Sequence, residues 1–118
     1  MLRENLLIIA SSEKDADLYY ATKFTAPDAF VFVQIRGKKY ILVSDLELDR
    51  AKKQTCVHAV LSTSRLAEEY KQKHKKACSF IELVSYFLKK RRVKSILVPG
   101  NFPVQYYEPL KRAGLRIR

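Results

Sequence analysis

The chain has 118 residues, a formal net charge of +11 and a hydrophobic content of 47%. These values exclude an intrinsically disordered chain and favour one globular domain with a core of its own. No apolar run approaches the roughly 18 residues of a membrane-spanning helix. The apolar segment 6–10 is also shorter than the ~7–15-residue core of a signal peptide, so we expect a cytoplasmic protein that does not use a membrane.

The amino-terminal part of the chain is rich in strand signals. Residues 28–35 combine β-branched and aromatic side chains, which favour a strand. Residues 36–38 predict a tight turn, because Gly37 adopts a positive φ without steric cost. The polar segment 11–17 predicts a loop or a short helical turn, and 22–27 predicts a loop. The strands expected here are 5–10, 18–20, 28–35 and 40–43.

Capping patterns indicate where the helices begin. Ser44 precedes Glu47 by three residues, and Ser79 precedes Glu82 by the same spacing, which is typical of capping boxes. After Ser79 the apolar residues recur at helical spacing, which makes this the clearest helix of the chain. The expected helices are 45–53, 64–76 with an apolar side of Leu66, Ala67 and Tyr70, 80–92 with a stripe of Phe80, Leu83, Val84, Phe87 and Leu88, and a last helix from Pro103 with a stripe of Val104, Tyr107 and Leu110.

Further strands are expected between and after these helices. Residues 57–62 predict a buried strand, and 95–99 predict one buried on both faces, because the apolar run does not alternate with polar residues. Gly114 is placed to end the last helix, and 115–118 begin another strand. The order β, β-hairpin, α, β, α, α, β, α, β predicts an α/β fold, a single domain with a mixed β-sheet flanked by helices.

Two short motifs give the chain a family resemblance. DLYYATKF at 17–24, an apolar hairpin and then SDLELDRA at 44–51 resemble the amino-terminal domain of the creatinase, prolidase and Xaa-Pro aminopeptidase family, which has a ribonuclease H-like motif. Lys23 stands where the family usually has glycine, and lysine resists the dihedrals that glycine allows. The residues that match the family's pattern are Asp17, Tyr20, Thr22, Phe24, Glu47, Arg50 and Ala51.

The resemblance implies that residues 1–118 are a non-catalytic amino-terminal domain and that the catalytic metallopeptidase domain is absent from this chain. The family's Xaa-Pro dipeptidases, aminopeptidases and creatinase-like hydrolases use two divalent metal ions (Mn, Co or Zn) in that other domain. The expected role is to support a homodimer or higher homo-oligomer and to shape access of the peptide substrate to the catalytic domain. A pseudo-enzyme that binds other proteins remains an alternative. An excised domain is favoured over a protein that has lost its partner domain.

The aromatic loop supplies the candidate site residues. In the family this loop can reach the active site of a neighbouring subunit, which implies that Tyr20 and Phe24 are substrate-access residues, with Lys23 as a charged contact. The alternative is that Tyr20 and Phe24 pack the hairpin against a helix, because aromatic residues dominate cores as well as interfaces. We also expect several aromatic residues along one edge of the sheet: Tyr19, Tyr20, Phe24, Phe102, Tyr106 and Tyr107.

Hydrolytic chemistry has no signal in this sequence. His58 lies in an apolar strand and His74 on a lysine-rich helix, and neither has an acidic residue at ligand spacing. The acidic residues within 45–49 alternate, but helical spacing turns Glu47 away, and a capping role explains it. There is no HExxH motif and no glycine-rich phosphate loop. We therefore expect no catalytic residue, metal or cofactor in this chain, and two reduced cysteines.

A different class of function depends on charge. Residues 1–49 carry 6 basic and 8 acidic side chains, whereas residues 50–118 carry 17 basic and 4 acidic ones. The alternative is therefore a stand-alone basic α/β module that binds nucleic acid through 71–76 and 89–94. We expect instead that these clusters are solvated surface, because in the sequence no aromatic residues interleave with the lysines as a stacking platform requires.

Overall fold

The computed structural model describes residues 5–10, 18–19, 22–24, 30–55, 57–100 and 102–118. The expected loop or turn at 11–17 and the segment 25–29 lie outside the described residues. The strands are β1 (Leu6–Ala10), β2 (Phe30–Ile35), β3 (Lys38–Val43), β4 (Ala59–Ser62), β5 (Ser95–Ile96) and β6 (Arg116–Ile117). The helices named here are α2 (Asp45–Gln54), α3 (Thr63–His74), α4 (Phe80–Lys90) and α5 (Val104–Arg112). This order confirms the predicted α/β fold.

The sheet is mixed, as predicted. β1 pairs antiparallel with β2, β2 pairs antiparallel with β3, and β3 pairs in parallel with β4. The parallel pair of β5 and β6 joins β1 through Leu97, whose carbonyl accepts from the Leu7 amide at 2.9 Å and whose amide donates to the Asn5 carbonyl at 2.7 Å. The strand order is therefore β6-β5-β1-β2-β3-β4, with β4 at one edge.

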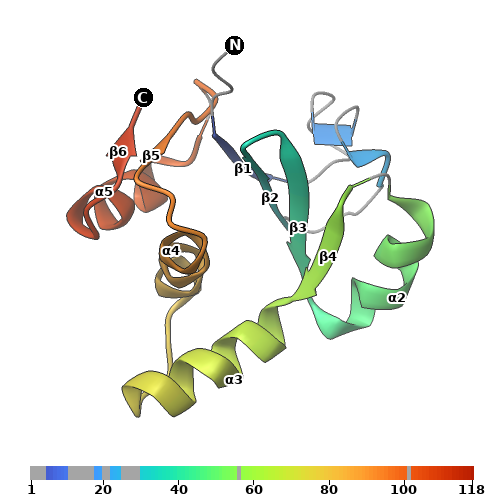
Figure 1. Cartoon of the computed structure of the whole chain (residues 1–118), viewed down its shortest axis with the longest axis horizontal. Coiled ribbons are helices and arrows are strands. Elements are labelled where there is room, and N and C mark those ends of the chain that lie inside the picture. Colours follow the sequence, from blue (N-terminus) through green and yellow to red (C-terminus); the bar gives the residue numbers. More distant parts are fainter. Residues whose placement is uncertain (1–4, 11–17, 20–21, 25–29, 56, 101) are drawn as a thin grey trace.

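Helices cover both faces of this sheet. Figure 1 shows α2 on one side of the strands and α4 on the other. On the α2 side a smaller core is formed by Ile8, Leu18, Phe24, Phe30, Phe32, Ile41, Val43 and Ala51. On the other side the core includes Leu7, Ile9, Val31, Val33 and Leu42 from the strands, with Leu66, Leu83, Phe87, Leu88 and Leu110 from α3, α4 and α5. Within the described residues no helix is long and apolar enough to cross a bilayer.

The predicted hairpin turn is present and is anchored to a helix. Arg36 and Gly37 have φ values of 50° and 85°, the pattern of the type I′ turns that match the twist of a hairpin. The Arg36 guanidinium donates to the carbonyls of Arg91 and Arg92, both at 3.3 Å. These carbonyls lie just past the end of α4, where backbone acceptors lack helical partners. The turn therefore also caps α4.

The two predicted capping boxes have different outcomes. At α4 the box is confirmed: the Glu82 amide donates to Ser79 Oγ at 3.2 Å, and the Ser79 amide donates to Glu82 Oε1 at 2.9 Å. At α2 the prediction is wrong, since Ser44 makes no side-chain capping bond. The physical reason is that both halves of the box have other partners: the Glu47 amide donates to the Ser44 main-chain carbonyl at 3.0 Å, and Arg50 Nε donates to the Glu47 carboxylate at 2.9 Å.

Two further predictions are corrected. The strand predicted at 18–20 is wrong, because Leu18 and Tyr19 are helical. The Lys23 amide donates to the Tyr19 carbonyl, which is the i to i+4 bond of a helix. Val104 is not part of a buried stripe and is 81% exposed. The packed side of α5 runs through Tyr106 and the buried Leu110, and a residue two positions before Tyr106 lies on the opposite side of the helix.

Candidate functional site

The two motif segments identified in the sequence are in contact on the α2 side of the sheet. The Phe24 ring is completely buried, packs edge-on against Phe30 with centroids 5.4 Å apart, and lies 4.7 Å from the Arg50 guanidinium carbon. Glu47 holds the same guanidinium from another direction. Thr55 Oγ1 donates to the Thr22 carbonyl at 2.7 Å. The residues that carry the resemblance therefore attach the loop to α2.

The three candidate substrate-access residues are in different environments. Tyr20 lies outside the described residues. Phe24 points into the core, packed between the hairpin and α2. Lys23 is exposed, and its Nζ lies 5.8 Å from the Tyr19 ring centroid. Its φ of 58° is the left-handed conformation that the family's usual glycine favours. The substrate-access roles of all three residues remain predictions.

The aromatic residues do not share one edge of the sheet, which corrects that expectation. Phe24 lies on the α2 side. Phe102 and Tyr106, with centroids 6.4 Å apart, pack against the other core, and Tyr106 also contacts Phe80 at 5.5 Å. The segment after β5 enters α5 on the far face of the sheet, so the sheet separates these two aromatic groups.

The histidine and acidic residues have structural partners. The Lys39 amide donates to His58 Nδ1 at 2.9 Å, and the His58 amide donates to the Lys39 carbonyl at 2.8 Å. His58 is exposed and lies just before β4 rather than inside the predicted strand. Asp45 accepts from the Ser62 hydroxyl. Among the described residues, no three side chains of His, Cys, Asp or Glu gather as a metal site would need. Cys78 is a free thiol, and Cys56 lies outside the described residues.

An aromatic cluster lies between α3 and α4, within the basic surface. The Tyr70 ring is 4.3 Å from the His74 ring and 5.5 Å from the Tyr86 ring, and Lys73 Nζ lies 6.0 Å from the Tyr86 centroid. Packing of the two helices thus brings Lys73 close to Tyr86, which is remote from it in sequence. The rings face one another and Lys73, however, rather than forming an open stacking surface.

One carboxylate connects these two helices. The hydroxyl of Tyr86 donates to Glu69 Oε1 at 2.9 Å, and Lys90 pairs with the same oxygen. The hydrogen bonds from Lys90 and then Tyr86 lower the pKa of Glu69. Burial, and then the hydrogen bond to Glu69, raises the pKa of Tyr86. This contact stabilises the packing of α3 on α4 at neutral pH.

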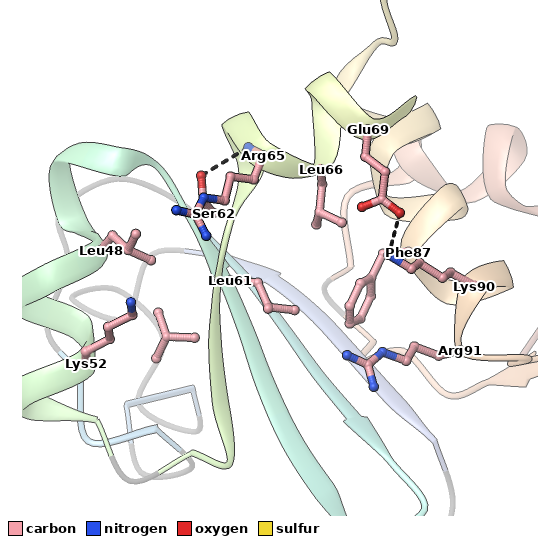
Figure 2. Close-up of a pocket in the computed structure, with 11 residues that line it drawn as sticks. Leu48, Lys52, Leu61, Ser62, Arg65, Leu66, Glu69, Phe87, Lys90 and Arg91 are labelled. Atoms are coloured by element: carbon pink, nitrogen blue, oxygen red, sulfur yellow. Dashed lines mark hydrogen bonds and ion pairs between the residues drawn. The ribbon is translucent and has the colours of Figure 1, made fainter. Parts of the chain in front are cut away.

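A cavity of about 230 Å³ lies along β4, and no pattern in the sequence predicted it. Figure 2 shows the strand passing between Leu48 and Lys52 on one side and side chains of α3 and α4 on the other. Its lining has an apolar part, which is Leu48, Val60, Leu61, Leu66 and Phe87, and a polar part, which is Lys52, Ser62, Arg65, Glu69, Lys90 and Arg91. Four elements contribute to the lining, so no local motif marks the cavity.

Comparisons with solved structures define the class of fold. The chain is 13% identical to an X-Pro aminopeptidase from Thermotoga maritima (TM-score 0.70, 97% of this chain and 30% of that one). It is 14% identical to a Xaa-Pro dipeptidase from Bacillus anthracis (TM-score 0.70, 97% and 28%). No protein-family model and no curated protein matches the sequence.

A third structure identifies the fold more closely. The creatinase/prolidase N-terminal domain of an X-Pro dipeptidase from Streptococcus pyogenes is 13% identical, with a TM-score of 0.62 over 98% of this chain and 80% of that one. The chain has the fold of the creatinase/prolidase N-terminal domain, which confirms the resemblance drawn from the motifs. It spans less than a third of the two longer proteins.

Proposed function

We propose that this chain is the non-catalytic amino-terminal domain of a Xaa-Pro dipeptidase- or aminopeptidase-like metallopeptidase of the cytoplasm. Its partners would be its own carboxy-terminal catalytic domain, which carries two divalent metal ions, and further copies of the same protein. The domain supports the oligomer and shapes the path of the peptide substrate. The observation that carries this proposal is the fold match over 97% of the chain to proteins of which it spans less than a third.

The packing of the loop on α2 supports the proposed role in shaping the path of the peptide substrate. Lys23 is exposed beside Tyr19, while Phe24 below it is fixed between Phe30 and Arg50. Because Phe24 is fixed in the core, the adjacent Lys23 is suited to holding its charge at the substrate entrance of a neighbouring catalytic domain. Lys23 is therefore the residue of this loop that we assign to substrate access.

The test is a domain replacement. The amino-terminal domain of the Thermotoga maritima X-Pro aminopeptidase is replaced by this chain, and hydrolysis of Xaa-Pro substrates is measured with Mn²⁺, Co²⁺ or Zn²⁺. Light scattering gives the oligomeric mass. We expect the chimera to form the parent's oligomer and to be more active than the catalytic domain alone. In the chimera Lys23→Ala is expected to raise KM, whereas Lys38→Ala, on the hairpin, leaves KM unchanged.

Two controls make the result decisive. A chimera with an unrelated α/β domain of the same length measures what any covalent partner contributes. The proposal is contradicted if the two chimeras have equal activity and equal mass, or if the isolated 118-residue chain itself turns over Xaa-Pro peptides.

The alternative function, a nucleic-acid-binding module, is not favoured. The basic clusters do surround aromatic residues, but the Tyr70 ring is covered by His74 and the Tyr86 ring by Lys73. Nucleic-acid bases stack on exposed ring faces.

A further inference from the structure

The edge of the sheet at β4 is open within the part of the chain that the structure describes. Among the described residues, β4 pairs with β3 alone and ends the strand order. The His58 amide donates to Lys39 at the start of this pairing, so position 58 faces β3. Backbone groups alternate in direction along a strand, and the amides and carbonyls of Ala59 and Leu61 therefore point away from β3. A row of backbone amides and carbonyls without strand partners can pair with a further strand.

The cavity of Figure 2 follows this open edge. Val60 packs with the core on the α2 side, and Leu61 packs with the core on the α3 and α4 side. Both side chains are half-buried and both line the cavity. The cavity therefore wraps around the strand edge, and an added strand would cover Leu48, Val60 and Leu61 together.

The rim of the cavity is strongly cationic. Four cationic side chains, Lys52, Arg65, Lys90 and Arg91, face a single carboxylate, Glu69. Lys90 already pairs with Glu69. The Arg65 amide donates to Ser62 Oγ at 3.2 Å, but the structure records no ion pair or hydrogen bond of the Lys52 side chain or the Arg65 guanidinium with any described residue. Positive charge from α2, from α3 and from Arg91, the residue that follows α4, thus remains around the strand edge.

We propose that the β4 edge binds an extended acidic segment of another polypeptide as an added β-strand. Main-chain bonds to Ala59 and Leu61 would supply the pairing, and carboxylates of the added strand would reach Lys52 and Arg65. The partner is not a second copy of this chain, because two such edges would bring like-charged rims together in a protein of net charge +11. The inference goes beyond the proposed function and does not rest on it.

The experiment is a titration of the ¹⁵N-labelled 118-residue chain, followed by NMR and by amide hydrogen exchange. The probe is a ten-residue peptide in which Glu-Glu and Val-Val pairs alternate, so that both faces of the added strand carry carboxylates. One control peptide has Lys in place of Glu, and another is N-methylated at alternate residues so that it cannot pair as a strand. We expect the Ala59 and Leu61 amides to shift and to become protected with the Glu peptide only. Its affinity falls as salt is raised.

Charge-reversal variants distinguish a specific edge from general attraction. Lys52→Glu with Arg65→Glu is expected to weaken binding at least tenfold. The matched control, Lys94→Glu with Arg112→Glu, makes the same charge change at exposed positions outside the cavity lining and is expected to weaken it less than twofold. The amide spectrum of each variant establishes that it is folded.

The proposal is overturned by any of three results: no binding of the Glu peptide at millimolar concentration, binding that leaves the Ala59 and Leu61 amides unprotected, or equal weakening by the two pairs of charge reversals. Activity of a metallopeptidase chimera enters none of these readouts, so the failure of this proposal and of the proposed function are distinguishable.

Discussion

Lys23 has a left-handed backbone conformation in a loop where the resembling family usually has glycine. This conformation costs a residue with a Cβ atom about 1 kcal/mol. Its neighbours hold it in place, since the Tyr19 carbonyl accepts from the Lys23 amide and Thr22 Oγ1 accepts from the Phe24 amide at 3.2 Å. The sequence identified the departure from the family but not its outcome, because the outcome depends on these contacts.

Glu69 gives a pH-dependent prediction at the same scale. Its pKa is lowered in the folded state by Lys90 and Tyr86, so its contribution to stability is present above the unfolded pKa of about 4.5 and is lost as the pH falls through the folded value. Glu69→Gln should therefore lower the free energy of unfolding at pH 7 by less than about 1 kcal/mol, because the pair is half-exposed. The deficit should be smaller at pH 3 than at pH 7, because protonation of Glu69 removes the interaction as the pH falls through the lowered pKa.

The neighbouring residue is the control for this measurement. Glu68 is exposed and has no ion pair with any described residue, so Glu68→Gln should leave the urea unfolding curve nearly unchanged at both pH values. A Glu69→Gln deficit of the same size at pH 7 and pH 3 would show that the ionised carboxylate is not the cause.

At the scale of elements, α2 and α4 show that a local sequence pattern predicts where a helix begins but not which capping bonds form. Both helices begin with a serine followed three residues later by a glutamate, and only α4 forms the box. At α4 the partners of Glu82 are within its own turn or on Tyr70. At α2 an arginine one turn further on takes the glutamate instead. Helix positions were predictable from spacing, but the choice between two partners was not.

This difference predicts unequal effects for the same substitution. Ser79→Ala should lower the free energy of unfolding by about 1 kcal/mol, because the Glu82 amide loses its acceptor. Ser44→Ala should change it by a few tenths of a kcal/mol at most, because Ser44 makes no side-chain capping bond. Equal losses for the two variants in urea denaturation would contradict the assignment.

At the scale of the whole molecule, the order of elements and the mixed sheet flanked by helices followed from the sequence. The apolar run at 95–99 predicted a strand buried on both faces, but β5 spans only Ser95–Ile96 and positions 97–99 are half-buried. Burial on both faces is found instead for β2 and β3, whose side chains contribute to both cores. The cavity at β4 was not predictable, because its lining comes from α2, β4, α3 and α4. Convergence of distant segments is a tertiary property with no local signal.

The two-sided core predicts the behaviour of adjacent residues on β3. Ile41 belongs to the core on the α2 side and Leu42 to the opposite core, and both are at most 1% exposed. Ile41→Ala and Leu42→Ala should each lower the free energy of unfolding by about 2–5 kcal/mol. Val104→Ala, at an exposed position, should stay within about 0.5 kcal/mol. If only one of the β3 variants is destabilised, one face of the sheet is not packed as described.

The junction of β1 with the Leu97 segment has a consequence for synthesis on the ribosome. The side chain of Asn5 donates to the Ser95 carbonyl across 90 positions of sequence, so β1 gains its second neighbour only when most of the chain has emerged. Closing so long a loop is slow relative to hairpin formation. The nascent chain should therefore first assemble the sheet from β1 to β4. Until the Leu97 segment pairs with it, β1 is an exposed edge strand, and this edge is where a chaperone would be needed.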